Sequence, residues 1–184
     1  HTSPSDTCLL LASGAAGNAT ITRKDQAYAK LLAALIDLCR DLAYQIVRDG
    51  EGATRVYRVK VRGTATEAQA DRIARCIVDS PLVKCAVHGG DPNWGRITTA
   101  AGYAGVAVQA QAMSLYIGPR REVCVFRRGQ PTPAGSSPPP ALKALMQQPE
   151  VTLTLIVGKG TAQVEWLGCD LSREYVRINA DYTT

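Results

Sequence analysis

The side chains that could do chemistry in this chain are carboxylates, amides, hydroxyls and a lysine rather than histidines. His88 is the only histidine besides His1, so we expect neither a metal cluster nor a Ser-His-Asp triad within the chain. A carboxylate can hold the ammonium group of an amino acid, while amides and hydroxyls can hold its carboxylate. The candidate residues for such a site are Glu51, Lys84, Asp91, Asn93, Asn179, Thr183 and Thr184.

Each candidate also has an ordinary structural interpretation. Glu51 can be an exposed loop acid, Lys84 a strand residue whose ammonium group reaches the surface, and Asp91 a turn former. Cys85 and His88 are not expected to form a thiol–imidazole dyad, because residues three positions apart on one strand face opposite sides. The glycine-containing segments match no phosphate loop, dinucleotide fingerprint or nucleophile elbow.

Composition narrows the class of protein. The chain has 184 residues, 46% of them hydrophobic, which is enough for one domain with a real core. Its net charge of +5 comes without basic clusters interleaved with aromatic residues, so nucleic acid is not an expected partner. No apolar run approaches the ~18 residues of a membrane span. The six cysteines lie among apolar neighbours without a CxxC pair, which predicts buried free thiols in a reducing cytoplasm.

The elements that must position the candidates are read from local patterns. In the most informative stretch, Ser80–Arg96, we predict a strand over Leu82–Val87, a turn at Asp91–Asn93 and a helix from Ile97. Elsewhere we predict a mixture of strands and helices, in which helix starts are read from capping patterns. These are a buried strand at 7–12, a helix from Thr22 to Arg48 covered on more than one side, a strand at 57–61, a helix capped by Thr64 and Glu67, a hairpin at 113–126, a helix at 141–147 and a hairpin at 151–166.

The sum is a mixed α/β or α+β domain with a partly antiparallel sheet. The helix after Thr64 should bury Ala70, Ile73, Ala74, Ile77 and Val78. The segment 129–140 (GQPTPAGSSPPP) is too rich in proline for a strand or a helix and is predicted to be a loop.

Five ordered motifs carry a resemblance to a known family. Essentially the whole of this chain resembles the β chain of the ornithine acetyltransferases (glutamate N-acetyltransferases) of arginine biosynthesis. The motifs are EGATR at 51–55, SPLVKC at 80–85, GGDPNWGR at 89–96, GCD at 168–170 and YVRINADYTT at 175–184.

The resemblance implies a fold and an activity. It implies a single β-chain domain over 1–184, folded as an α/β sandwich of mixed sheets and helices similar to N-terminal-nucleophile hydrolases. It also implies a cytoplasmic α2β2 heterotetramer, made by self-cleavage of a precursor, that moves acetyl from N-acetylornithine to glutamate without a cofactor. The nucleophile would be an N-terminal threonine with its own amino group as base. Oxyanion-hole threonines would come from the α chain.

The same resemblance assigns individual residues. Glu51, Asn179 and Thr184 match substrate-contacting positions, whereas Lys84 and the DPNWGR turn match residues that we interpret as structural support. The Thr-Met-Leu start of the family's β chain does not occur here, so the nucleophile is expected upstream of His1 and the chain alone is expected to be inactive.

Two other interpretations stay open. The chain could belong to an aminopeptidase or amidase of a related nucleophile fold, in which water accepts the acyl group, or it could be a non-catalytic fragment that only binds. Glu51 and the tail from Asn179 to Thr184 favour amino-acid acceptors over water.

Overall fold

The computed structural model describes residues 7–181, which divide into two compact units between Ile46 and Val47. The first unit holds residues 7–25, which form neither helix nor strand, and nearly all of α1 (Gln26–Arg48). The carboxylate of Asp25 accepts the Tyr28 N–H at 3.0 Å, so the helix begins after Asp25 rather than at Thr22.

Two predictions for this first unit are wrong. Residues 7–12 are not a buried strand, since Leu9, Leu10 and Leu11 are all exposed. No residue of α1 is buried either, although its face carries the expected apolar row. A strand needs a neighbouring strand and an apolar stripe needs a surface to cover it, and the described residues of this unit supply neither.

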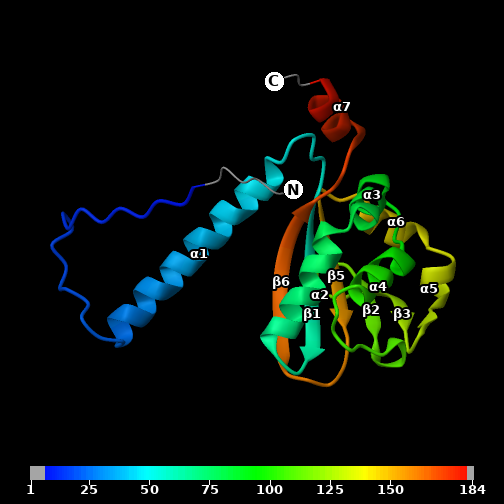
Figure 1. Cartoon of the computed structure of the whole chain (residues 1–184), viewed down its shortest axis with the longest axis horizontal. Coiled ribbons are helices and arrows are strands. Elements are labelled where there is room, and N and C mark those ends of the chain that lie inside the picture. Colours follow the sequence, from blue (N-terminus) through cyan, green and yellow to red (C-terminus); the bar gives the residue numbers. More distant parts are fainter. Residues whose placement is uncertain (1–6, 182–184) are drawn as a thin grey trace. The chain divides into compact units, whose positions relative to one another are not determined.

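Residues 47–181 form a six-stranded mixed sheet in the order β4-β3-β2-β5-β1-β6 (Figure 1). Strands β1 and β5 are parallel, and the other neighbours are antiparallel. The mixed α+β class is therefore confirmed. The strands are β1 (Val56–Thr64), β2 (Ser114–Ile117), β3 (Val123–Arg127), β4 (Gln130–Pro131), β5 (Glu150–Ile156) and β6 (Ala162–Cys169).

The hairpin predicted over 151–166 does not form, although both of its strands do. β1 lies between them, so that Val61 pairs with Leu155 on one side and with Val164 on the other. The turn at Gly158 packs tightly against Gly63, which has φ +86 and no room for a side chain. The hairpin at 113–126 is confirmed by the pairing of β2 with β3.

Helix α2 lies over one face of the sheet, and α3 and α4 pack against α2 (Figure 1). The predicted core face of α2 is buried in full against Tyr57, Val59 and Val61 of β1. Its capping box uses Thr66 and Gln69 rather than Thr64 and Glu67. The helices of this unit are α2 (Glu67–Asp79), α3 (Pro81–Gly89), α4 (Trp94–Gly102), α5 (Pro133–Ser136), α6 (Pro140–Met146) and α7 (Arg173–Asp181), with a 3₁₀ turn at Ala110–Ala112.

The segment predicted as a strand at Leu82–Val87 is helix α3. Ser80 caps it by accepting the Val83 N–H at 3.4 Å, Pro81 occupies the first turn, and Gly90 closes it with φ +67. Its buried residues, Val83, Lys84, Ala86 and Val87, follow helical spacing. A short apolar run does not distinguish a strand from a buried helical segment, and the caps decide the outcome here.

The proline-rich segment 129–140 is also not a plain loop. It contains β4 and the single turn α5, which starts at Pro133, a position where the missing N–H of proline has no intrahelical partner to lose.

The cysteines contradict the prediction of buried thiols. Only Cys169 is buried among the six, while Cys76 and Cys124 are half-buried and Cys8, Cys39 and Cys85 are exposed. The buried strand and covered helix on which the prediction rested for Cys8 and Cys39 do not form, and helix α3 presents Cys85 to solvent. Within the described part of the chain, no helix is long and apolar enough to cross a membrane.

Candidate functional site

Two of the three predicted site residues meet although they lie 128 positions apart. The Asn179 Nδ2 group of α7 donates to Glu51 Oε2 at 2.8 Å and to the carbonyl of Tyr175 at 2.9 Å. Both side chains are exposed. The third predicted residue, Thr184, lies outside the described residues, and the substrate-binding role of the set stays a prediction.

The hydrogen bonds determine what this pair can offer a ligand. Because both N–H bonds of Asn179 Nδ2 are directed to acceptors, the group left on this side chain is the carbonyl oxygen Oδ1. Glu51 contributes a carboxylate. The Glu51 carboxylate and Asn179 Oδ1 are both acceptors, and together they suit an ammonium group. The prediction from sequence is different, since it has the amide of Asn179 hold a carboxylate.

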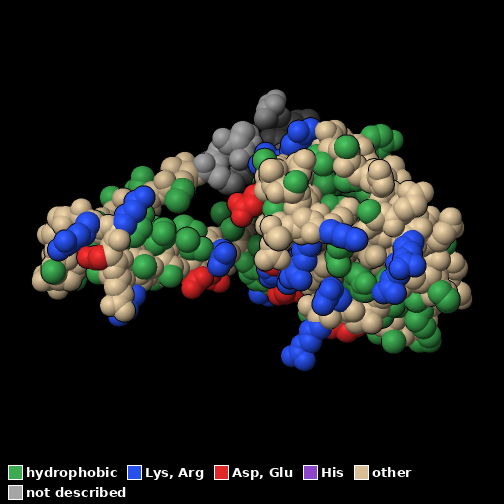
Figure 2. Space-filling model, turned by 90° about the horizontal axis from the view of Figure 1, so that it is seen from below, with side chains coloured by type: hydrophobic (Ala, Val, Ile, Leu, Met, Phe, Trp, Pro, Cys, Tyr) green, Lys and Arg blue, Asp and Glu red, His purple; other side chains and the backbone are tan. Residues whose placement is uncertain are grey.

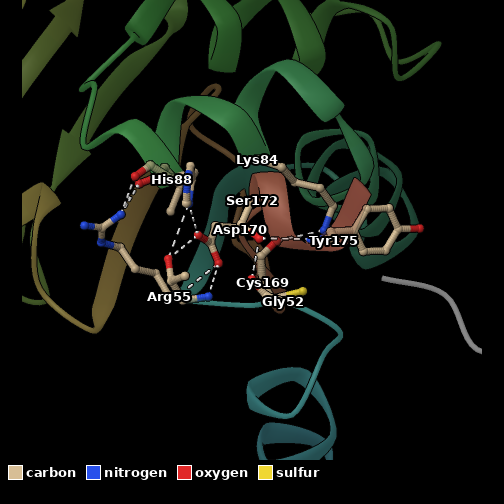
Figure 3. Close-up of polar contacts among 10 residues, drawn as sticks. Gly52, Arg55, Lys84, His88, Cys169, Asp170, Ser172 and Tyr175 are labelled. Carbon is tan, nitrogen blue, oxygen red and sulfur yellow. Dashed lines mark hydrogen bonds and ion pairs between the residues drawn. The ribbon is translucent and has the colours of Figure 1, made fainter. Parts of the chain in front are cut away.

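A buried carboxylate fixes the residues that follow Glu51. Asp170 accepts the N–H of Thr54 at 2.7 Å, the Thr54 hydroxyl at 2.5 Å, the N–H of Arg55 at 2.8 Å, and a bond from His88 Nδ1 at 2.7 Å (Figure 3). Burial would raise the pKa of Asp170, but these hydrogen bonds outweigh it and hold the pKa below its usual value. The carboxylate therefore stays charged and fully hydrogen-bonded.

A second contact ties the same turn to α7. The Ser172 hydroxyl donates to the carbonyl of Gly52 at 2.5 Å and accepts the Tyr175 N–H at 3.2 Å (Figure 3). Gly52 has φ +64, and a Cβ there would lie 2.5 Å from the Tyr175 nitrogen. The turn that carries Glu51 and the helix that carries Asn179 thus meet at a glycine that tolerates no side chain.

Lys84 lies behind this site rather than in it. It is buried on α3, and its Nζ donates to the carbonyl of Cys169 at 2.9 Å (Figure 3). Its ammonium group also lies 5.9 Å from the centre of the Tyr57 ring. These contacts support the interpretation of Lys84 as a structural residue that holds the end of β6.

Thr54, His88 and Asp170 form a group that the sequence patterns do not predict. It does not have the geometry of a catalytic triad, because Thr54 Oγ1 and Asp170 Oδ2 both approach the same His88 atom, Nδ1, at 3.4 and 2.7 Å. A helical assignment of α3 would have placed Lys84 and His88 one turn apart on one face, directed at 169–170. The strand assignment concealed this signal.

The DPNWGR turn forms a structural corner. Asn93 caps α4 by accepting the Arg96 N–H at 3.0 Å and donates to Asp91 at 3.0 Å. The Trp94 ring stacks on Phe126 with their centres 5.1 Å apart. Within residues 7–181, no group of three or more His, Cys, Asp or Glu side chains could hold a metal ion.

Comparison with known proteins identifies the family to which the sequence is similar. A family model described as the ArgJ family matches residues 1–184. The curated proteins named arginine biosynthesis bifunctional protein ArgJ from Deinococcus radiodurans and Bacillus subtilis are 45% and 37% identical to the chain. Each alignment covers 100% of this chain and 43% or 44% of the relative, so the chain spans less than half of their length.

A solved structure gives the same result for the fold. The crystal structure of arginine biosynthesis bifunctional protein argJ from Bacillus halodurans superposes with a TM-score of 0.89 at 38% sequence identity. The alignment covers 99% of this chain and 83% of that chain. The predicted family fold is therefore confirmed over nearly the whole chain.

Proposed function

The chain belongs to the ArgJ family, the ornithine acetyltransferase family of arginine biosynthesis, and we propose that it forms the β-chain part of such an enzyme. The proposed reaction moves the acetyl group of N2-acetylornithine to glutamate and gives ornithine and N-acetylglutamate. The observation that carries this proposal is the Glu51–Asn179 pair, in which two acceptors from distant parts of the chain meet on one exposed surface.

The chemistry of the donor substrate fits this pair. In N2-acetylornithine the α-nitrogen carries the acetyl group, so the side-chain ammonium is the only cationic group left. Glu51 would bind that ammonium through a charge-assisted hydrogen bond, and Asn179 Oδ1 would accept a second one. The hydrogen bonds of Asp170 and Ser172 hold the turn that carries Glu51 against α7, which carries Asn179, before the substrate arrives.

The proposed nucleophile is a threonine upstream of His1, freed by self-cleavage of a precursor, with its α-amino group as base. Its hydroxyl oxygen adds to the acetyl carbon while its proton passes through the amino group to the departing ornithine nitrogen. The acetyl group is left as an ester on threonine. The neutral amino group of glutamate then attacks the ester carbon, and the proton that it loses returns to the threonine oxygen.

The proposed partner is the α chain of the same precursor in an α2β2 assembly in the cytoplasm, and the chain alone would be inactive. The first unit supports a partner because its large apolar residues are exposed: Leu9, Leu10, Leu11, Leu31, Leu38, Leu42 and Ile46. Figure 2 shows hydrophobic side chains along this unit. The curated relatives are more than twice as long as the matched region, which leaves room in them for such a chain.

The test measures the fate of the acetyl group. The chain is produced together with its upstream segment and the α chain, supplied with N2-acetylornithine and glutamate, and assayed for N-acetylglutamate and for free acetate. Transfer to glutamate supports the proposal, while release of acetate at the same rate with or without glutamate would show a hydrolase. Absence of both products would show that the chain only binds.

Two variants locate the ammonium site. Glu51→Gln keeps the shape but removes the charge, which should weaken binding of N2-acetylornithine by roughly 1.5–3 kcal/mol, or more than tenfold. Glu67→Gln, at an exposed acid in the first turn of α2, is the matched control and should leave the kinetic constants unchanged. Equal kinetics in both variants would make Glu51 an ordinary loop residue.

A further inference from the structure

The second unit contains an open hollow of about 900 Å³ between α2 and α4, at the beginning of α3. Its apolar lining includes the buried residues Ala100 and Ala104 and the exposed side chain of Leu82. Its volume lies within the range of small-molecule sites in proteins, roughly 300–1,000 Å³. The proposed acetyl transfer uses none of its lining residues.

The segment Ser80–Arg96, which carries two of the family motifs, contributes to the lining of this hollow. Both ends of Ser80–Arg96 line it, through Ser80–Leu82 at the start of α3 and through Asn93, Gly95 and Arg96 at the start of α4. The middle of the stretch turns away toward Asp170 through Lys84 and His88. One segment therefore contributes to two separate places on the unit.

The charge of the lining is positive. The lining contains three arginines, Arg72, Arg75 and Arg96, and one acid, Asp79. Arg75 already interacts with Asp71 at 3.7 Å and lies over the Trp166 ring at 4.6 Å. Neither Arg72 nor Arg96 pairs with a carboxylate among residues 7–181, so two guanidinium charges in the hollow are not neutralised by the described chain.

Backbone carbonyls hold these two guanidinium groups in place. Arg72 Nη2 donates to the carbonyls of Ala104 at 3.1 Å and Gly105 at 2.9 Å, and Arg96 Nη1 donates to the carbonyl of Leu82 at 3.1 Å. A guanidinium carries five N–H donors, and these bonds occupy only one nitrogen of each group. The remaining donors form planar forks, which match the oxygens of a carboxylate or a phosphate.

We propose that this hollow binds a small organic anion, with an apolar body against Leu82, Ala100 and Ala104 and an anionic head group on Arg72 and Arg96. The shared chemistry is a carboxylate or phosphate joined to a hydrocarbon or aromatic body. The apolar lining contributes affinity, and the two cations select for the charge.

The test compares three probes of nearly the same shape: 2-naphthoate, 2-naphthyl phosphate and the neutral 2-naphthamide. Each is titrated into the full chain labelled with ¹⁵N, and backbone amide shifts are followed by NMR. At least one anion should bind tenfold or more tightly than the amide, about 1.4 kcal/mol, with the largest shifts in α2, α4 and the start of α3. Whichever anion binds more tightly identifies the head group.

Variants separate the charge from the cavity. The double variant Arg72→Gln with Arg96→Gln should weaken anion binding at least tenfold and leave the amide unchanged, while the matched Arg62→Gln on β1, outside the lining, should change neither. Thr99→Phe fills the hollow with the arginines intact and should weaken all three probes. Equal affinity for anion and amide, shifts outside the hollow, or no saturable binding would overturn the proposal.

Discussion

Around Asp170, four hydrogen bonds converge on one buried carboxylate, whereas α1 presents a row of leucines and buries no residue at all. The first region is complete within the chain, because the donors and acceptors that position the Glu51 turn come from residues 51–179. The second has amphipathic character without a surface to bury it. The difference shows that local polar geometry can be complete in a chain that leaves other apolar surfaces exposed.

The substitution with the largest expected effect on the free energy of unfolding is Asp170→Asn. An amide cannot accept all four bonds, and its own N–H atoms face donors, so buried groups lose their partners. We expect a loss of about 3 kcal/mol in the free energy of unfolding, measured by urea titration. A change below about 0.5 kcal/mol would show that the polar region is not held by this carboxylate.

The pH dependence of stability tests the same carboxylate without a change of shape. Hydrogen bonds hold the folded-state pKa of Asp170 below its usual value, so folding favours the charged form. Its contribution is complete above the ordinary pKa of about 4 and is lost as the pH falls through the lower folded value. The stability gap between wild type and Asp170→Asn should therefore narrow below about pH 4, and a constant gap would contradict this.

Gly52→Ala tests the contact between the Glu51 turn and α7. The positive φ and the 2.5 Å approach to the Tyr175 nitrogen should cost about 1–3 kcal/mol in unfolding free energy and reduce acetyl transfer. Gly89→Ala in α3 is the matched control, since a Cβ at Gly89 would meet no atom within 4 Å and a helix favours alanine. Similar losses in both variants would remove the special role of Gly52.

Asn179→Ala should separate function from stability. The side chain is exposed, so we expect less than about 0.5 kcal/mol in unfolding free energy. Loss of its bond to Glu51 and of the acceptor Oδ1 should raise the KM for N2-acetylornithine about tenfold in the assembled enzyme. Unchanged KM at matched folding would limit Asn179 to its structural bonds with Glu51 and Tyr175.

Thiol labelling tests the exposure of α1 without any substitution. Cys39 in α1 is exposed and Cys169 is buried, so Cys39 should react with a thiol reagent about tenfold faster or more in the isolated chain. Assembly with the α chain should slow Cys39 if α1 is covered. Fast labelling of Cys39 in the assembly would contradict our proposal that α1 is part of the interface.

The sequence was informative where the pattern is local and repeated. The core face of α2 and the alternation of Tyr57, Val59 and Val61 in β1 were predicted correctly. An element that is buried on one side carries apolar residues at a regular spacing, which can be recognised in the sequence. The resemblance between motifs assigned Glu51 and Asn179 to substrate-contacting positions, but their direct contact was not predicted, since no spacing rule connects residues 128 positions apart.

The wrong predictions concern nonlocal strand pairing and apolar segments that stay exposed. Nothing in the turn at Gly158 indicates that β1 enters between β5 and β6. Leu9–Leu11 carry the composition of a strand, but composition does not show whether a neighbouring strand is present to pair with them. Because the apolar run at Leu82–Val87 predicts a strand, the sequence pattern gives no sign that His88 and Asp170 meet.

The place of β1 in the sheet has a consequence for synthesis of the chain. Among the described residues, this strand pairs with β5 and β6 alone, which begin at Glu150 and Ala162, so a ribosome delivers these two neighbours long after β1 itself has emerged. Until then its backbone groups and its valines have no sheet partner, and closing so long a loop is slow. During translation, α2, which follows β1 directly and packs on it, is therefore the first element that can cover its valines.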